Sequence, residues 1–115
     1  IVDDNRDAAD SLAALLELEG FEVRTVHDGP QALTTARAWQ PDSVVLDIGL
    51  PGMDGYQVAT ALRDAFADRP LQLLAVTGYG QSSDRERTRQ AGFDLHLVKP
   101  VDFDELTTAL LQPVR

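Results

Sequence analysis

Short apolar runs of the kind that form buried strands alternate along this chain with stretches whose apolar residues recur at helical spacing. Two strands that flank a helix are joined by a crossover, so they lie parallel in one sheet with helices on both faces. The pattern therefore predicts an α/β fold with a five-stranded parallel sheet in a three-layer sandwich. The predicted strands are 1–2, 21–26, 43–47, 71–76 and 93–98.

Residues that stop or cap a helix mark the ends of the predicted helices. Gly20 is suited to the left-handed conformation that ends the first helix, and Pro41 stops the second. Asp54 and Asp102 each precede a Gln or Glu by three residues, which is the pattern of a capping box. The fourth helix, 84–90, is almost entirely polar, which is typical of a solvated helix or of a marginally stable one that a signal shifts. The predicted helical stretches are 8–16, 28–39, 58–66, 84–90 and 102–110.

Residues 1–115 are predicted to form one domain, because no linker, low-complexity segment or internal repeat divides them. The first strand is short for the centre of a parallel sheet. Only two apolar residues precede Asp3, whereas strands usually run about five residues. We therefore expect the first strand to be truncated in this sequence and to begin several residues earlier.

Composition excludes several classes of protein. The chain has no cysteine, which rules out disulfide scaffolds, thiolate metal sites and cysteine nucleophiles. The 10 Lys and Arg against 19 Asp and Glu give a net charge of −9, which argues against direct binding to nucleic acid. No apolar run approaches the roughly 20 residues of a membrane-spanning helix, and no secretory signal opens the sequence. We expect a cytoplasmic location without membrane contact.

Polar residues at the carboxyl ends of the predicted strands indicate a binding site. They are Asp3, Asp4, Asp47, Thr77 and Lys99. In a parallel sheet these ends share one edge, where ligands bind at the point at which the strand order reverses. Three carboxylates, one hydroxyl and one ammonium group are therefore expected in one crevice.

The charges of this expected cluster predict a metal ion. Three carboxylates carry −3, Lys99 supplies +1, and a divalent cation brings the sum to zero. Carboxylate oxygens without His or Cys nearby in the sequence favour Mg²⁺. A carboxylate beside Mg²⁺ can accept a phosphoryl group as a nucleophile, while the metal, the ammonium and the hydroxyl stabilise the charge of the transferring group.

Four segments, in this order and at these spacings, are IVDDN (1–5), VLDIGLPGMDG (45–55), AVTG (75–78) and VKP (98–100). Together they closely resemble the receiver domain of response regulators in bacterial two-component and phosphorelay signalling, over nearly the whole chain. The resemblance implies a flavodoxin-like sheet of strand order 2-1-3-4-5. The stretches 47–55 and 92–102 look most like the receivers of hybrid sensor histidine kinases.

The resemblance implies a role for each acid. Asp47 is the expected phospho-acceptor. Asp4, with Asp3 directly or through a water, is expected to hold Mg²⁺. An Asp47 oxygen and the backbone carbonyl of Gly49 complete the implied set of metal ligands.

The resemblance also implies residues that respond to the phosphoryl group. Thr77 is expected to hydrogen-bond a phosphoryl oxygen, Lys99 to form an ion pair with it, and the Lys99–Pro100 peptide bond to be cis. His96 occupies the position at which family members usually carry the aromatic switch residue. An imidazole that alternates with two leucines is also consistent with a solvent-facing residue, and that alternative stays open. His27 is interpreted as a surface residue.

The implied function is to take a phosphoryl group from a phosphohistidine on a histidine kinase or a histidine phosphotransfer domain. The fourth helix, fifth strand and fifth helix are the expected output face, through which two copies could pair as a homodimer. The domain is not expected to be an enzyme beyond its self-catalysed phosphoryl transfer and autodephosphorylation.

Three other functions fit parts of the pattern. A Mg²⁺-dependent phosphohydrolase that forms an aspartyl phosphate usually needs a second Asp two residues after the nucleophile, where this chain has Gly49. A nucleotide- or flavin-binding module has a glycine-rich phosphate loop after its first strand, which this sequence lacks. The third alternative is a pseudo-receiver that binds partners without being phosphorylated. Such a domain does not need an acceptor, metal ligands and a lysine, so the presence of the complete set argues against it.

Overall fold

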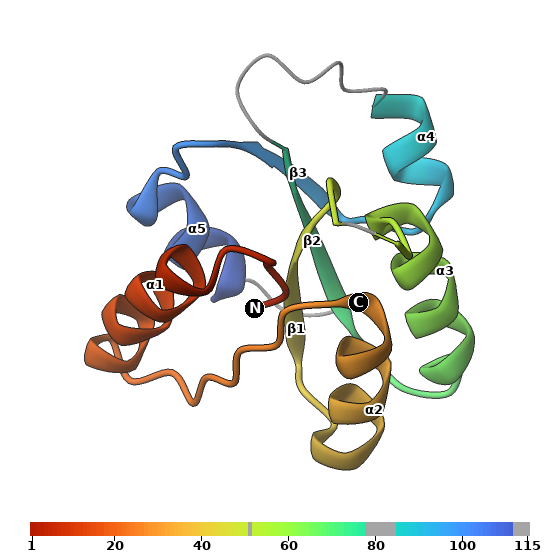
Figure 1. Ribbon diagram of the computed structural model, residues 1–115, viewed down its shortest axis with the longest axis horizontal. Helices are drawn as coiled ribbons and strands as arrows, with labels where there is room; N and C mark the ends of the chain where they lie inside the picture. The colour runs from red at the N-terminus through yellow and green to blue at the C-terminus, as the bar shows by residue number, and fades with distance from the viewer. Residues whose placement is uncertain (51, 78–84, 112–115) are drawn as a thin grey trace.

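Helices and strands alternate from residue 29 onward in the computed structural model, which describes residues 1–50, 52–77 and 85–111 (Figure 1). The elements in chain order are α1 (Arg6–Leu18), α2 (Gly29–Trp39), β1 (Ser43–Asp47), α3 (Gly55–Ala65), β2 (Gln72–Thr77), α4 (Arg85–Gln90), β3 (Leu95–Val98) and α5 (Phe103–Leu110). The predicted α/β fold is confirmed. None of the helices in these described ranges is long and apolar enough to cross a membrane.

The three regular strands form a parallel sheet in the order β1-β2-β3. Next to β1, Val2 makes one parallel bridge to Leu46 and another to Val26. The order of segments across the sheet is therefore 21–26, 1–2, β1, β2 and β3. This is the order 2-1-3-4-5 that the resemblance implies.

The first two predicted strands form single bridges instead of regular strands. Only two residues precede Asp3, so this segment has room for one pair on each side. Its bonds to β1 run from the Val2 amide to the Val45 carbonyl oxygen (2.8 Å) and from the Asp47 amide to the Val2 carbonyl oxygen (2.9 Å). Segment 21–26 borders this short segment, and its pairing is equally short.

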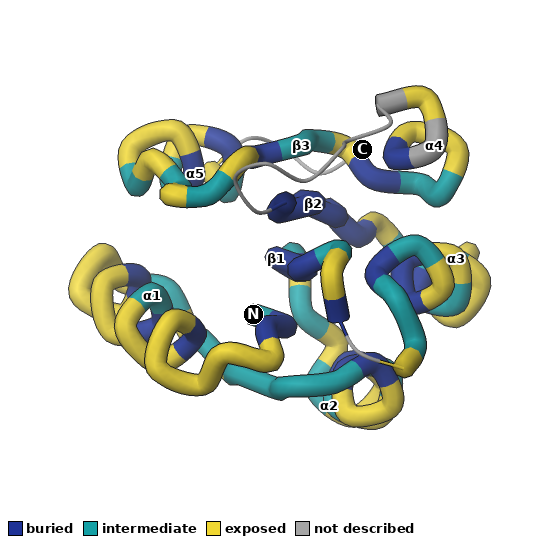
Figure 2. The backbone as a smooth tube through the Cα atoms, turned by 45° about the horizontal axis from the view of Figure 1, so that its top comes forward, coloured by how far each residue is buried: buried dark blue, intermediate teal, exposed yellow. Residues whose placement is uncertain are grey.

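Helices cover both faces of the sheet (Figure 2). Val44 and Leu46 of β1 pack in a core with α2 and α3, whereas Val45 packs in a second core with α1 and α5. In β2, Leu73 belongs to the first core and Leu74 to the second. The strands are apolar on both faces because both faces of a parallel sheet are buried.

Side-chain caps fix where the helices begin. The predicted capping box at α3 is confirmed: the Gln57 amide donates to Asp54 Oδ1 and the Asp54 amide donates to Gln57 Oε1, both at 3.0 Å. Asp102 is the N-cap of α5. Gly20, at φ +94°, follows the end of α1 as predicted. Asp84, the first residue of the predicted fourth helix, lies outside the described residues.

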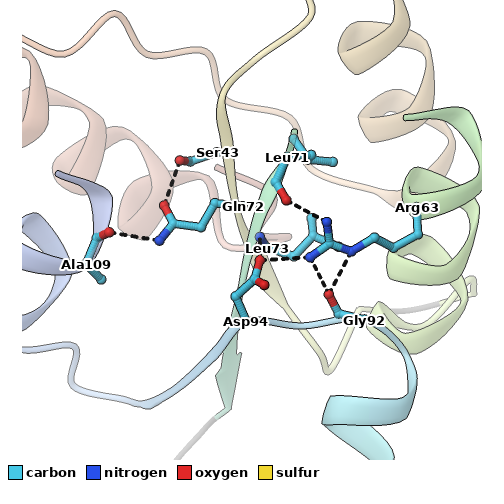
Figure 3. A network of polar contacts seen from close by, with 8 residues as sticks. All are labelled: Ser43, Arg63, Leu71, Gln72, Leu73, Gly92, Asp94 and Ala109. Atoms are coloured by element: carbon cyan, nitrogen blue, oxygen red, sulfur yellow. Dashed lines mark hydrogen bonds and ion pairs between the residues drawn. The ribbon is translucent and has the colours of Figure 1, made fainter. Parts of the chain in front are cut away.

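Arg63 of α3 joins three segments at the amino-terminal edge of the sheet (Figure 3). Its guanidinium donates to the carbonyl oxygens of Leu71, just before β2, and of Gly92, just before β3. It also forms an ion pair of 2.8 Å with Asp94, which accepts a hydrogen bond of 2.9 Å from the Leu73 amide. The planar guanidinium, with its five donors, is suited to hold several acceptors at once.

Arg63→Ala is expected to lower the free energy of unfolding by about 2–3 kcal/mol, because it leaves two part-buried carbonyl groups without this donor. The exposed ion pair to Asp94 adds little to that cost. Arg37→Ala, at an exposed position in the last turn of α2, is the control and should stay within about 0.5 kcal/mol of wild type. Urea denaturation followed by circular dichroism measures both. Equal stability of the two variants would contradict the role given to Arg63.

Candidate functional site

The carboxyl edge of the sheet gathers the polar residues selected from the sequence. Asp47 is the last residue of β1, Thr77 is the last residue of β2, and Lys99 follows β3 directly. Asp3 follows the bridge residue Val2. The Lys99 amide donates to the Thr77 carbonyl oxygen at 2.8 Å, which extends the pairing of β2 and β3 by one bond. The structure therefore brings the ends of neighbouring strands to one edge.

Three carboxylates lie close together at this edge. Asp3, Asp4 and Asp47 each offer one carboxylate oxygen, and the three oxygens lie within 4.8 Å of one another. Asp3 and Asp47 are both 8% exposed, whereas Asp4 is exposed to solvent. Charges of one sign at this separation, two of them buried, repel strongly unless cations compensate them.

Lys99 lies between two of these carboxylates. Its Nζ is 3.3 Å from Asp3 Oδ2 and 3.3 Å from Asp47 Oδ2. Burial alone lowers the pKa of Lys99, but the attraction of Asp47 and Asp3 and the hydrogen bonds to both outweigh it and raise the pKa above its ordinary value. The ammonium is therefore charged at neutral pH and offsets one of the three negative charges. The Lys99–Pro100 peptide bond is cis, as expected.

Two glycines shape the loop that follows β1. The Gly49 amide donates to Asp47 Oδ1 at 2.9 Å, so one carboxylate oxygen is held by the loop and the other by Lys99. The amide of Gly55 at the start of α3 donates to the Ile48 carbonyl oxygen at 3.0 Å. A Cβ on Gly55 would lie 2.5 Å from Ile48 Cα, so a larger residue does not fit without a backbone shift. This close approach fixes the position of α3 against the end of β1.

Thr77 and His96 form a hydrogen-bonded pair on neighbouring strands. Thr77 Oγ1 lies 3.0 Å from His96 Nε2. Thr77 is buried and His96 is half-buried. The structure therefore favours the interpretation of His96 as a partner of Thr77 over that of a solvent-facing residue. The proton of this hydrogen bond is carried by either Thr77 Oγ1 or His96 Nε2, according to the tautomer of the imidazole.

His27 lies against the site, which corrects its interpretation as a surface residue. It is half-buried, and its Nδ1 is 3.0 Å from the Asp3 carbonyl oxygen. The signal in the sequence is its place in the pattern, because His27 follows the predicted strand 21–26 directly. The rule that selected Asp3 and Lys99 at the ends of their strands also selects His27.

The donor set fits a hard divalent cation. Oxygens that share one Mg²⁺ at about 2.1 Å are at most about 4.2 Å apart, so small side-chain movements close the observed spread of the carboxylates. Three carboxylates with one ammonium leave a local charge of −2, since −3 and +1 add to −2. The exposure of Asp4 leaves room for the waters that Mg²⁺ retains.

A cavity of about 300 Å³ opens beside the carboxylates. Asp47 and Lys99 line one part of it, and Leu12 and Leu15 of α1 line another together with Val101. Leu15 is 48% exposed. The cavity therefore connects the carboxylate cluster to an apolar surface on α1.

Known proteins share both the sequence pattern and the fold. Residues 1–111 match the family described as the response regulator receiver domain. The transcriptional regulatory protein PrrA of Mycobacterium leprae is 43% identical over 106 residues, which cover 92% of this chain and 45% of PrrA. The chain therefore spans about half the length of this curated relative.

Two solved structures that resemble this fold hold ions. The receiver domain of the sensor histidine kinase PA1611 from Pseudomonas aeruginosa has a magnesium ion coordinated in its active site cleft. It superposes with a TM-score of 0.82 at 33% identity, covering 95% of this chain and 89% of that one. A response regulator protein from Burkholderia pseudomallei, with a phosphorylated aspartic acid, a calcium ion and citrate, has a TM-score of 0.84 at 29% identity. That match covers 96% of this chain and 64% of the other.

Proposed function

The chain belongs to the response regulator receiver domain family, and on this premise we propose that Asp47 is its phospho-acceptor. Members of this family are signalling modules of two-component systems, and no enzyme family is indicated. The donor that we propose is a phosphohistidine on a histidine kinase or a histidine phosphotransfer domain. The observation that carries the proposal is the joint placement of three carboxylates and Lys99 at one edge of the sheet.

The proposed metal is Mg²⁺. Its proposed ligands are Asp3, Asp4, Asp47 and the backbone carbonyl of Gly49. When bound, Mg²⁺ supplies positive charge that offsets both the acids and the phosphoryl oxygens of the donor. The proposed role of the protein is to hold the carboxylates together before the metal binds. The hydrogen bonds of Lys99 to Asp3 and Asp47 do this. The magnesium-bound PA1611 receiver supports this assignment.

The proposed reaction is a transfer between two side chains. An oxygen of Asp47 forms a bond to phosphorus while the phosphorus–nitrogen bond of the donor breaks, and the leaving imidazole keeps the electron pair and takes up a proton. Lys99 Nζ, 3.3 Å from Asp47 Oδ2, is placed to form an ion pair with the transferred group. Attack by water on phosphorus later restores Asp47 and releases phosphate, which is the proposed autodephosphorylation.

The proposed switch starts at Thr77. When its hydroxyl moves toward a phosphoryl oxygen to donate to it, Thr77 Oγ1 leaves its 3.0 Å contact with His96 Nε2 and the imidazole on β3 is free to move. We assign the output to the face formed by α4, β3 and α5, and we propose that a partner or a second copy binds there. An apolar side chain on this face supports a binding role, because Val98 of β3 is 50% exposed.

The cavity between α1 and Lys99 is the proposed docking place for the donor. It opens at Asp47, and Leu15 on its rim offers apolar surface to a helix that carries the phosphohistidine. We infer a cytoplasmic location, since histidine kinases use cytoplasmic ATP. The net charge of −9 supports a domain that does not itself contact nucleic acid.

Incubation with acetyl phosphate, with and without Mg²⁺, tests the proposed function. Intact mass measurement should show one added phosphoryl group in the presence of Mg²⁺ and almost none after chelation. Hydroxylamine should remove the group, because it cleaves acyl phosphates. An adduct that forms equally well without a divalent ion contradicts the metal assignment. Failure to take up phosphate from both acetyl phosphate and a phosphohistidine protein contradicts the acceptor function.

A further inference from the structure

A short parallel ladder joins segment 21–26 to the start of the chain. The Val26 amide donates to the Ile1 carbonyl oxygen at 2.9 Å, and the Asp3 amide donates to the Val26 carbonyl oxygen at 3.1 Å. In a regular parallel ladder, the next donor would be the amide of Asp28, and it would bind the Asp3 carbonyl oxygen.

A side chain supplies that bond in this protein. Asp28 begins α2 as its N-cap, and its carboxylate accepts from the Gln31 amide at 2.8 Å. The Nδ1 atom of His27 lies 3.0 Å from the Asp3 carbonyl oxygen. A carbonyl oxygen only accepts, so Nδ1 carries the proton in this contact. The imidazole therefore extends the ladder by one hydrogen bond at the edge where the carboxylates gather.

The Asp3 carbonyl belongs to the peptide unit that leads into Asp4. That unit is planar, so a bond that holds the carbonyl also orients the amide and Cα of Asp4. The Asp3 side chain is held separately, because Oδ1 accepts from the Asn5 amide at 2.9 Å and Oδ2 contacts Lys99 at 3.3 Å. His27 thus acts on the backbone unit that links two of the three clustered acids.

The backbone that carries the imidazole is itself fixed by α2. The His27 amide donates to Gln31 Oε1 at 3.1 Å, and the Gln31 amide donates to Asp28. His27 is half-buried. The imidazole is therefore presented to Asp3 from the residue directly before the N-cap of α2, and the bond of its backbone to Gln31 limits its freedom to swing away.

We propose that His27 is a positioning residue for the metal site. Its Nδ1–H holds the peptide unit between Asp3 and Asp4, so that the two acids are arranged for Mg²⁺ before the ion binds. The proposal rests on the proposed function, because it requires the carboxylate cluster to bind Mg²⁺. Without the bond, the ion must order this peptide unit on binding, which lowers its affinity.

A matched pair of variants separates the hydrogen bond from the bulk of the side chain. His27→Asn keeps an N–H donor at the distance of Nδ1 from the backbone, whereas His27→Leu has nearly the shape of Asn and no donor. Calorimetric titration of the 115-residue chain with Mg²⁺ alone is expected to show about tenfold weaker binding for His27→Leu, the low end of effects seen for partners of metal ligands. His27→Asn is expected to bind within about twofold of wild type by the same reasoning.

Each outcome decides the proposal. Equal Mg²⁺ affinity of wild type and His27→Leu overturns the positioning role while leaving the metal site intact. Equal weakening in His27→Asn and His27→Leu also overturns it, because the donor is then not the cause. If wild type itself does not bind Mg²⁺, the metal assignment and the inference both fail. If His27→Leu does not fold, as judged by circular dichroism, His27→Gln takes its place. The amide donor of Gln lies one bond further from the backbone than Nδ1 of His27, so it does not replace the hydrogen bond to the Asp3 carbonyl.

Discussion

Asp47→Asn is expected to eliminate the phosphoryl adduct that the wild-type chain forms with acetyl phosphate and Mg²⁺. The substitution replaces a charged nucleophile with a neutral amide that does not attack phosphorus, and it also removes one of the three clustered negative charges. The amide oxygen of Asn can still accept the hydrogen bond from Gly49, so the loop after β1 should keep its shape, while the NH₂ group replaces the oxygen that contacts Lys99 and that contact is lost. Intact mass should therefore show loss of the adduct below detection in a folded protein.

Asp54→Asn is the matched control for this variant. Asp54 lies on the same loop, but it caps α3 and is not part of the carboxylate cluster. Asn is also a good N-cap, so the control should fold and accept the phosphoryl group as wild type does. A full yield of hydroxylamine-labile adduct in Asp47→Asn would identify a different acceptor. Loss of the adduct in both variants would point to the loop as the cause.

Lys99→Ala is expected to separate phosphorylation from the response of the output face. In the described part of the chain, Lys99 is the cation in contact with Asp47, and it lies on the short connection between β3 and α5. On the proposed function, its ammonium moves to the phosphoryl group and is expected to draw this connection toward the site. Without it, Mg²⁺ binding is retained because all three carboxylates remain, but the connection is no longer attached to the phosphorylated residue.

The measurement for Lys99→Ala is a comparison of backbone NMR shifts with and without phosphorylation. Wild type should show large changes over β3 and α5, and the variant should lose most of them while changes near Asp47 remain. Lys99→Arg, which keeps the charge at a different reach, is expected to recover part of the response. Shifts on β3 and α5 in Lys99→Ala that match wild type would show that the lysine does not couple the two regions.

The sequence predicts the site better than it predicts the strands. Residues at strand ends need only the order of the elements to be right, because parallel strands bring their carboxyl ends to one edge. Asp3, Asp47 and Lys99 therefore meet as expected. The length of a strand depends in addition on how many residues its neighbours offer, and segment 21–26 has only the two-residue segment 1–2 beside it.

The hydrogen bonds of the two histidines could not be predicted from the sequence. His27 and His96 occupy strand ends or strand positions that the pattern locates well, but their hydrogen bonds depend on tertiary geometry. His27 reaches the Asp3 carbonyl because Asp28 turns the chain into α2. His96 reaches Thr77 because β2 and β3 are in register. Neither contact is visible in the spacing of residues along the chain.

The contacts of Arg63 determine how the sheet can move. They tie the residues just before β2 and just before β3 to α3, at the edge opposite the carboxylates. A strand that is fastened at one end and pulled at the other is restricted to tilting about the fastened end. A pull on Lys99 is thus expected to displace β3 least near Arg63 and most beside Lys99. On the proposed function, phosphorylation of Asp47 would therefore leave the domain as a change in the angle of β3.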